Sequence, residues 1–270
     1  MTGQGAGVRV AALLFALGLL FGMTGSAVAA GSVPAEARAQ LVPTGKLRVA
    51  FLTYDPSLGS RDASGGPGGV EGDLARLLAD RVGVPLQPIF YDTPQAYAES
   101  IGTLAWDVAF AGRDVPGRLD YGPTILLVEH ALLLGPGKSF QDLADVDRDD
   151  VRVGVTVGSM EERFLAQRLH RAFIFRVLVG ADAASATLRN SGADVFAGSV
   201  PFLTKVAADI PGSRIIGPSY ALVPVVLAVA PGRTSALGYL ADLIREAKTT
   251  GFIQKAINKA KLPGVTVGPP

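Results

Sequence analysis

The chain of 270 residues contains no cysteine, which excludes disulfide bonds and lipid attachment through a cysteine. It also lacks an excess of one charge, with 25 basic and 24 acidic residues, so it offers no basic surface for nucleic acid. The two histidines, His130 and His170, lie far apart in the chain, and neither has a metal-like companion. No glycine-rich phosphate loop follows a strand pattern. We therefore expect no metal, no cofactor and no nucleic-acid partner.

The first thirty residues are expected to be a signal peptide. They contain one charge, Arg9, and an apolar run over 10–23 that ends before the small residues 27–29. The alternative is a membrane anchor, but the run is shorter than the ~20 apolar residues that a span needs. Cleavage would leave about 240 residues, enough for one large domain or two modest ones. The product would be periplasmic and free of lipid.

The chain repeats one pattern. Residues 46–53 and 150–157 are short, β-branched runs, as in strands buried on both faces of a parallel sheet. A helical stretch follows each run, and then a strand with Asp-Val near its start, at 106–110 and 193–196. Two α/β units predict two lobes, and small ligands bind in clefts between lobes. The alternative is one larger open α/β sheet.

Two long extended runs, at 125–134 and 223–229, flank the second unit and predict a two-stranded hinge near 132–136 and 224–228. Lobe 1 would comprise 46–134 and 226–270, and lobe 2 would comprise 135–225. Residues 31–45 show no periodic pattern and are expected to be a linker. A long, glycine-rich loop at 54–69 is a candidate functional loop. The remaining pattern predicts strands at 85–91, 107–111, 173–179 and 194–197, and helices at 72–83, 95–104, 160–172, 181–190, 235–249 and 252–261.

The order and spacing of several short motifs carry a family resemblance. They are Gly-Lys-Leu-Arg-Val at 45–49, Gly-Val-Glu-Gly-Asp-Leu-Ala at 69–75, Trp-Asp-Val-Ala at 106–109, an arginine seven residues after Ala111, and Val-Gly-Val-Thr-Val-Gly-Ser at 153–159. Together they resemble the solute-binding proteins of ABC transporters, in the polar amino acid class. The resemblance implies the α/β fold of type II periplasmic binding proteins, two open sheets joined by a two-stranded hinge. It also implies a monomer that delivers a small anionic or zwitterionic ligand to a permease.

The resemblance assigns ligand contacts to two segments. Arg118, beyond a strand end, matches the arginine that grips the ligand carboxylate through a two-pronged pair of hydrogen bonds. The same segment contains Gly112, Arg113 and Asp114. Arg113 stands near a position where the family carries a hydroxyl or small residue, so it either adds a second cation to the site or indicates that the loop is one residue shorter here. Gly158 and Ser159 precede a helix, where Ser159 suits an N-cap and the family's matching hydroxyl meets the ligand carboxylate.

The amine side of the site departs from the family. Ser199 stands where the family places an aspartate for the ligand ammonium. The ligand is therefore either an organic acid, or one of Asp55, Asp62 and Glu71 replaces that aspartate. Tyr54 is a candidate for stacking on the ligand.

The resemblance also leaves an enzyme open. Periplasmic cyclohexadienyl dehydratases are similar to this family, and such chemistry needs a general acid. Glu71 and Glu129 are the candidates. A third reading, the ligand domain of a sensor, would require a following membrane span, which the sequence does not contain.

Overall fold

The structure is a computed structural model that describes residues 2, 33–55, 59–113, 115 and 117–270. The helices are α1 (Ala35–Leu41), α2 (Gly69–Val82), α3 (Pro94–Ser100), α4 (Leu143–Val146), α5 (Met160–Ala166), α6 (Ala181–Arg189), α7 (Val200–Ala208), α8 (Thr234–Thr249) and α9 (Phe252–Ala260). The strands are β1 (Leu47–Leu52), β2 (Gly59–Arg61), β3 (Pro67–Gly68), β4 (Leu86–Tyr91), β5 (Val108–Gly112), β6 (Asp120–Leu134), β7 (Arg152–Thr156), β8 (Phe173–Val177), β9 (Val195–Ser199), β10 (Arg214–Val229) and β11 (Val265–Val267). The expected signal peptide lies outside the described residues.

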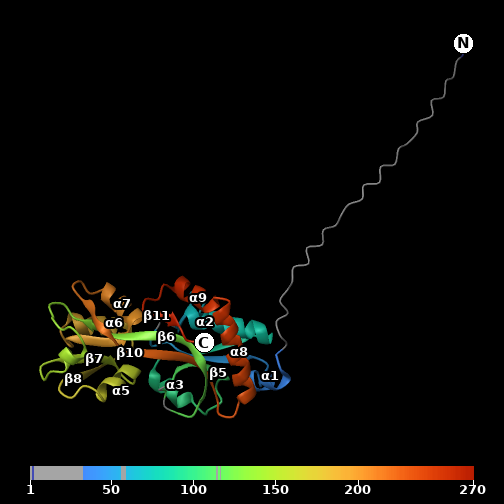
Figure 1. The fold of residues 1–270 in the computed structure, drawn as a ribbon, viewed down its shortest axis with the longest axis horizontal. Coiled ribbons are helices and arrows are strands. Elements are labelled where there is room, and N and C mark those ends of the chain that lie inside the picture. The colour runs from blue at the N-terminus through green and yellow to red at the C-terminus, as the bar shows by residue number, and fades with distance from the viewer. Residues whose placement is uncertain (1, 3–32, 56–58, 114, 116) are drawn as a thin grey trace. The chain divides into compact units, whose positions relative to one another are not determined.

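The fold contains two units of parallel strands, and one pair of long strands is shared by both units (Figure 1). In the first unit β1 pairs in parallel with β4 and β5, and in the second β7 pairs in parallel with β8 and β9. The strand order of the described sheet is β4-β1-β5-β10-β6-β9-β7-β8, and β11 adds to β6. β6 and β10 pair with each other and extend into both units. The two predicted sheets are therefore continuous through this pair, and the prediction of two α/β lobes is confirmed.

The predicted repeat extends to one side-chain arrangement. Asp107 and Asp194 precede β5 and β9, and each accepts a hydrogen bond from the backbone N–H of the arginine in the neighbouring strand, Arg48 at 3.1 Å and Arg152 at 2.7 Å. In return, the backbone N–H of each aspartate donates to the carbonyl of that arginine, at 2.9 and 2.8 Å. The same carboxylate thus fixes the register of two parallel strands in each lobe.

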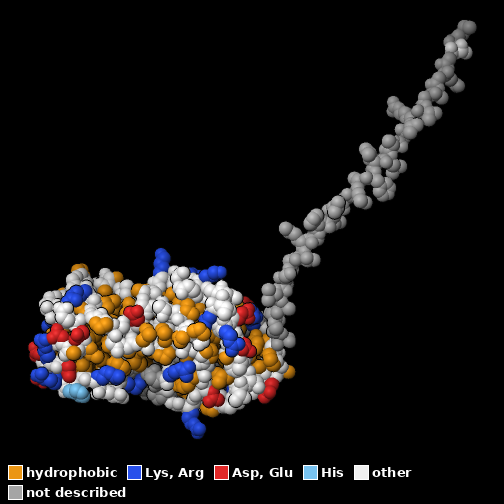
Figure 2. Space-filling view, viewed as in Figure 1, with side chains coloured by type: hydrophobic (Ala, Val, Ile, Leu, Met, Phe, Trp, Pro, Cys, Tyr) orange, Lys and Arg blue, Asp and Glu red, His pale blue; other side chains and the backbone are white. Residues whose placement is uncertain are grey.

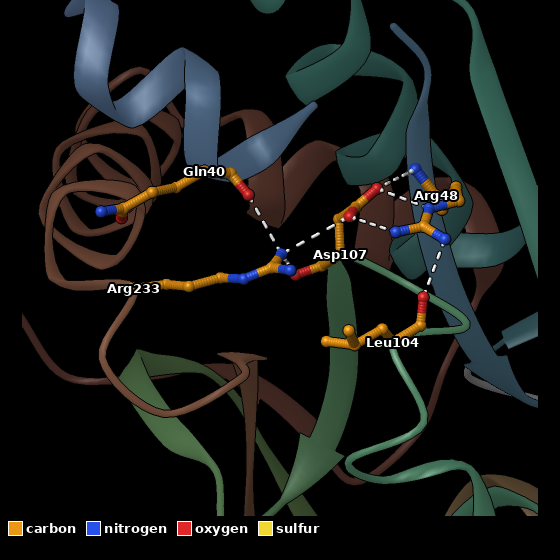
Figure 3. Close-up of polar contacts among 5 residues, drawn as sticks. All are labelled: Gln40, Arg48, Leu104, Asp107 and Arg233. Atoms are coloured by element: carbon orange, nitrogen blue, oxygen red, sulfur yellow. Dashed lines mark hydrogen bonds and ion pairs between the residues drawn. The ribbon is translucent and has the colours of Figure 1, made fainter. Parts of the chain in front are cut away.

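The first of these carboxylates is the more enclosed (Figure 3). Asp107 is fully buried, and the Arg48 guanidinium reaches both of its oxygens, at 2.7 and 3.0 Å. Arg233, at the start of α8, contacts the same carboxylate at 3.5 Å and donates to the carbonyl of Gln40 at 3.0 Å. This cluster ties α1 and α8 to the edge of lobe 1.

The segment expected to be a linker contains helix α1. Ala37 and Leu41 are buried, and the helix packs against α8. The backbone N–H of Ala236 donates to the Gln40 side chain at 2.9 Å, which strengthens the attachment. The linker prediction is wrong here because the buried face of α1 consists of Ala37 and Leu41 alone, too few residues to show an apolar period.

Two further helices differ from the sequence prediction. Helix α5 ends at Ala166, although the pattern indicated 160–172. Helix α7 was not predicted, and it begins directly after β9 with Ser199 as its N-cap and a proline in its first turn. The second difference adds a helix start at the end of β9, a strand of lobe 2.

The packing shows where the chain passes from one lobe to the other. On β6, Val128 belongs to the core of lobe 1 and Ala131 to a core of lobe 2. On β10, Ile216 packs in lobe 2 and Val225 in lobe 1. Glu129 and Leu222 lie opposite each other between these positions. The crossing is thus nearer to this pair than to the expected hinge at 132–136 and 224–228.

The surface agrees with the balanced composition. Figure 2 shows acidic and basic side chains interspersed on the face in view, without an extended patch of one sign among the residues drawn in colour. Within the described ranges, each helix is too short or too polar to cross a membrane.

Candidate ligand site

A cavity of about 260 Å³ lies between the two lobes. Its walls come from residues that follow the carboxyl ends of β1, β5 and β7, because parallel strands bring these ends to one edge of a sheet. Lobe 1 contributes Leu52, Tyr54, Asp55, Glu71, Tyr97, Phe110, Gly112 and Val115, lobe 2 contributes Gly158, Ser159, Met160 and Arg163, and β6 and β10 contribute Val128, His130, Val223 and Val225. Of the predicted site residues, Tyr54, Gly112, Gly158 and Ser159 therefore line one cavity.

The lobe 2 wall is a capped helix start. The Ser159 hydroxyl accepts the N–H of Glu162 at 3.2 Å, and the Glu162 carboxylate accepts the N–H of Gly158 at 2.6 Å. Burial alone would raise the pKa of Glu162, but hydrogen bonds from Arg176 and Gly158 lower it. The N–H of Gly158, in the segment expected to contact a ligand anion, is therefore already bound by the Glu162 carboxylate.

A cation on this wall was missed by the sequence analysis. Arg163 lines the cavity, and its Nη1 donates to the carbonyl of Gly158 at 2.9 Å. The available signal was its place one turn after Ser159, because residues i and i+4 share a helix face.

The segment after β5 contributes less than expected. Arg118 is exposed and does not line the cavity. Arg113 is also exposed, and its Nη2 donates to the carbonyl of Gly122 at 2.9 Å, with the guanidinium 5.8 Å from the Tyr121 ring centre. Asp114 lies outside the described residues. The structure therefore does not bring Arg118 and Arg113 together with the other predicted site residues.

Ser199 connects the two lobes. It is buried at the N-cap of α7, where its hydroxyl accepts the N–H of Phe202 at 3.2 Å. The same hydroxyl donates to the carboxylate of Asp55 in lobe 1. A carboxylate is thus present beside the position that the family resemblance reserves for an aspartate, but the other lobe supplies it.

The other acids proposed from the sequence occupy different settings. Asp62 is exposed in a turn, where it accepts the N–H groups of Ser64 and Gly66, both at 2.9 Å. Glu129 is half-buried outside the cavity and accepts the hydroxyl of Ser219 at 2.8 Å. Among the three candidates for the ammonium, only Asp55 and Glu71 line the cavity.

Glu71 is a buried acid in the cavity wall. It lies in the first turn of α2 and is 8% exposed. Burial, and then the nearby charge of Asp55, raise its pKa to about 8. Gly59 packs against it so closely that a Cβ there would lie 2.5 Å from Oε2. At neutral pH this carboxyl group therefore holds a proton.

A buried titratable pair, His130 and Glu161, lies beside the cavity, and His130 forms part of the cavity wall. Nδ1 of His130 and Oε1 of Glu161 are 2.9 Å apart, and both side chains are buried. Burial is the largest effect and favours a higher pKa for Glu161, but the hydrogen bond and charge interaction with His130, together with hydrogen bonds from the Glu161 backbone and Ser159, lower the pKa overall. Among the described residues, no group of three His, Asp or Glu side chains lies close enough together to hold a metal ion.

Comparisons with known proteins rest on structure. No protein-family model matches the chain, and no curated protein matches its sequence. Three solved structures are similar: a mutant of ArgBP from T. maritima, a solute receptor for L-cysteine of Neisseria gonorrhoeae, and an ancestral amino acid-binding protein described as a precursor of cyclohexadienyl dehydratase.

The likeness spans nearly the whole of each known structure. The ArgBP mutant has a TM-score of 0.71 at 20% identity, over 83% of this chain and 99% of that one. The cysteine receptor has a TM-score of 0.72 at 19% identity, over 84% of this chain and 94% of that one. The ancestral protein has a TM-score of 0.70 at 20% identity, over 82% of this chain and 97% of that one. The chain therefore has the two-lobed α/β fold of the type II periplasmic binding proteins.

Proposed function

We propose that this protein is a periplasmic solute-binding protein that captures a small zwitterionic ligand between its lobes. The observation that carries the proposal is the arrangement of the cavity walls, with the cation Arg163 on lobe 2 and the carboxylate of Asp55, beside the acid Glu71, on lobe 1. Groups of opposite charge on opposite walls suit a ligand with a carboxylate at one end and an ammonium at the other. The volume of about 260 Å³ is below that of typical drug-sized sites, which suits a molecule of amino acid size.

The proposal extends to transport. One of the similar structures is described as the substrate binding protein of an amino acid ABC transporter. The signal-peptide pattern of residues 1–30 would bring this chain to the same side of the membrane as such a permease. We infer delivery of the ligand to an ABC permease as its role.

A thermal-shift screen tests the binding function. The screen contains the twenty standard amino acids and a set of organic acids, because a ligand that binds only the folded state raises the melting temperature by mass action. Calorimetry then measures the affinity of each compound that raises it. If none of these compounds stabilises the protein, the proposed function is contradicted.

Two variants decide which arginine holds the ligand carboxylate. Arg163 lines the cavity, whereas Arg118 has the support of the family resemblance. Truncating one partner of a buried charge pair costs roughly 2–5 kcal/mol, or about thirtyfold or more in affinity. We expect this loss for Arg163→Ala and a smaller one for Arg118→Ala. Arg245→Ala, an exposed arginine of α8 paired with Asp242, is the matched control and should bind as the parent does.

One observation favours an enzyme as the second candidate. Glu71 is protonated at neutral pH and faces the cavity, as a general acid for dehydration would be. Incubation with a cyclohexadienyl substrate tests this candidate. Turnover that disappears in Glu71→Gln would support the enzyme, whereas binding without turnover supports the receptor.

A further inference from the structure

The Glu71 carboxyl group lines the cavity and has no hydrogen-bond or ion-pair partner among the residues that the structure describes. The residue is nevertheless only 8% exposed. The nearby hydroxyl of Tyr97 donates to the carbonyl of Phe110 at 2.9 Å and so is directed elsewhere. A buried polar group of this kind is costly unless something satisfies it. Its position in the cavity wall makes the ligand the available partner.

The charged and titratable groups around Glu71 come from four elements. Asp55, after β1, is also an acid and adds to the negative potential. Tyr97 of α3 stays neutral, because burial and then the charge of Glu71 raise its pKa. His130 of β6 is paired with Glu161, and Arg163 of α5 is hydrogen-bonded to the Gly158 carbonyl. Among the described contacts, none joins Glu71 to a cation.

We propose that a protonated amine on the ligand binds beside Glu71 and Asp55 and displaces the proton of Glu71 into solvent. The ligand ammonium keeps its own protons, and the Glu71 carboxyl becomes a carboxylate paired with it. One proton therefore leaves the protein for each ligand bound. This inference rests on the proposed function and adds to it the residue that pairs with the ammonium, Glu71, and the proton that this residue releases.

The sign of the pH dependence follows from this exchange. The ligand-free protein holds the proton up to pH of about 8, and the ammonium lowers the pKa of Glu71 in the complex. Between these two values, affinity rises with pH by about tenfold per unit, because one proton is released. At lower pH, where Glu71 stays protonated in both states, the slope disappears.

Calorimetry in buffers of different ionisation enthalpy measures the released proton directly. The probes are the twenty standard L-amino acids and the matching 2-hydroxy acids, which lack the ammonium. At pH 7 we expect a bound amino acid to release about one proton. The matching 2-hydroxy acid should bind more weakly and release none.

Three variants assign the proton to Glu71. Glu71→Gln should abolish the release and flatten the pH dependence, whereas Glu36→Gln, at an exposed acid of α1 that does not line the cavity, should behave as the parent does. Asp55→Asn is the second test if Glu71→Gln does not fold. This substitution removes the charge of Asp55, so Glu71 is protonated in a smaller fraction of the ligand-free molecules at pH 7. Fewer protons are then released per ligand bound.

Each outcome distinguishes the two proposals. Binding of an amino acid without proton release, or release that persists in Glu71→Gln, overturns this inference and leaves the proposed function intact. Equal binding by the 2-hydroxy acids also overturns it. If neither set of compounds binds, the proposed function fails and this inference fails with it.

Discussion

Glu71 links the folding of lobe 1 to pH. Its pKa is about 8 in the folded protein against 4.5 for an ordinary glutamate, so the unfolded chain loses the proton first as pH rises. The stabilising effect of the protonated form is complete below pH of about 4.5 and is lost as pH rises through about 8. The free energy of unfolding falls by about 1.4 kcal/mol for each pH unit between these two values.

We therefore expect Glu71→Gln to gain stability over the parent between pH of about 5 and about 9. The neutral amide imitates the protonated acid and cannot ionise. Urea unfolding at several pH values gives the free energy of unfolding for both proteins. Glu129→Gln controls for the general effect of removing an acid. If the curves of Glu71→Gln and the parent stay parallel across this range, the buried acid is not the cause.

Individual site residues were predicted unevenly. Tyr54, Gly112, Gly158 and Ser159 were predicted from the family resemblance and from a strand end, and they line the cavity. Their environment was not predicted, although Glu162 stands three residues after Ser159, the spacing of a capping box. That spacing indicates a helix start whose N–H groups are bound by side chains of the chain itself. A ligand carboxylate would then need a cation from another residue.

At the scale of the elements, each lobe uses an aspartate to link two parallel strands, but the ion pairs of the two aspartates differ in how buried they are. Asp107 is fully buried between two arginines, whereas Asp194 has Lys138 at 2.5 Å, with a side chain that is 41% exposed. Water can replace the lysine but cannot easily replace the enclosed arginine contacts.

Asp107→Asn should therefore destabilise the protein more than Asp194→Asn. Breaking an enclosed charge pair costs about 3–5 kcal/mol, whereas the loss at the more open position should be about 1–2 kcal/mol. Equilibrium unfolding in urea measures both. An equal or larger loss for Asp194→Asn would show that burial of the arginines does not set the difference.

The elements that the sequence missed are short. Helix α1 has 7 residues and buries only Ala37 and Leu41, whereas α7 has 9 residues and follows β9 directly, with a proline in its first turn, so its pattern merges with that of the strand. The central parallel strands β1, β7 and β9 were predicted well, because each is an apolar run with buried residues through its centre. Local pattern identifies such runs, but it does not show which helix packs beside which strand.

For the whole molecule, two lobes followed from the repeated α/β unit, but the point of crossing did not. β6 has 15 residues and β10 has 16, and both contribute buried residues to the two lobes. Glu129 interrupts the apolar run of β6, but the run around Leu222 on β10 continues, so the sequence did not identify Glu129 and Leu222 as the positions where packing changes. We expect the lobes to move about this pair when a ligand binds.

Small-angle X-ray scattering, with and without a ligand found in the screen, is the decisive test of closure on a ligand. A receptor that closes two lobes on its ligand should show a smaller radius of gyration at saturation. Arg163→Ala, at a ligand concentration that does not saturate it, should keep the radius of the free protein. An unchanged radius for the parent at saturation would contradict a two-lobed receptor that closes on its ligand.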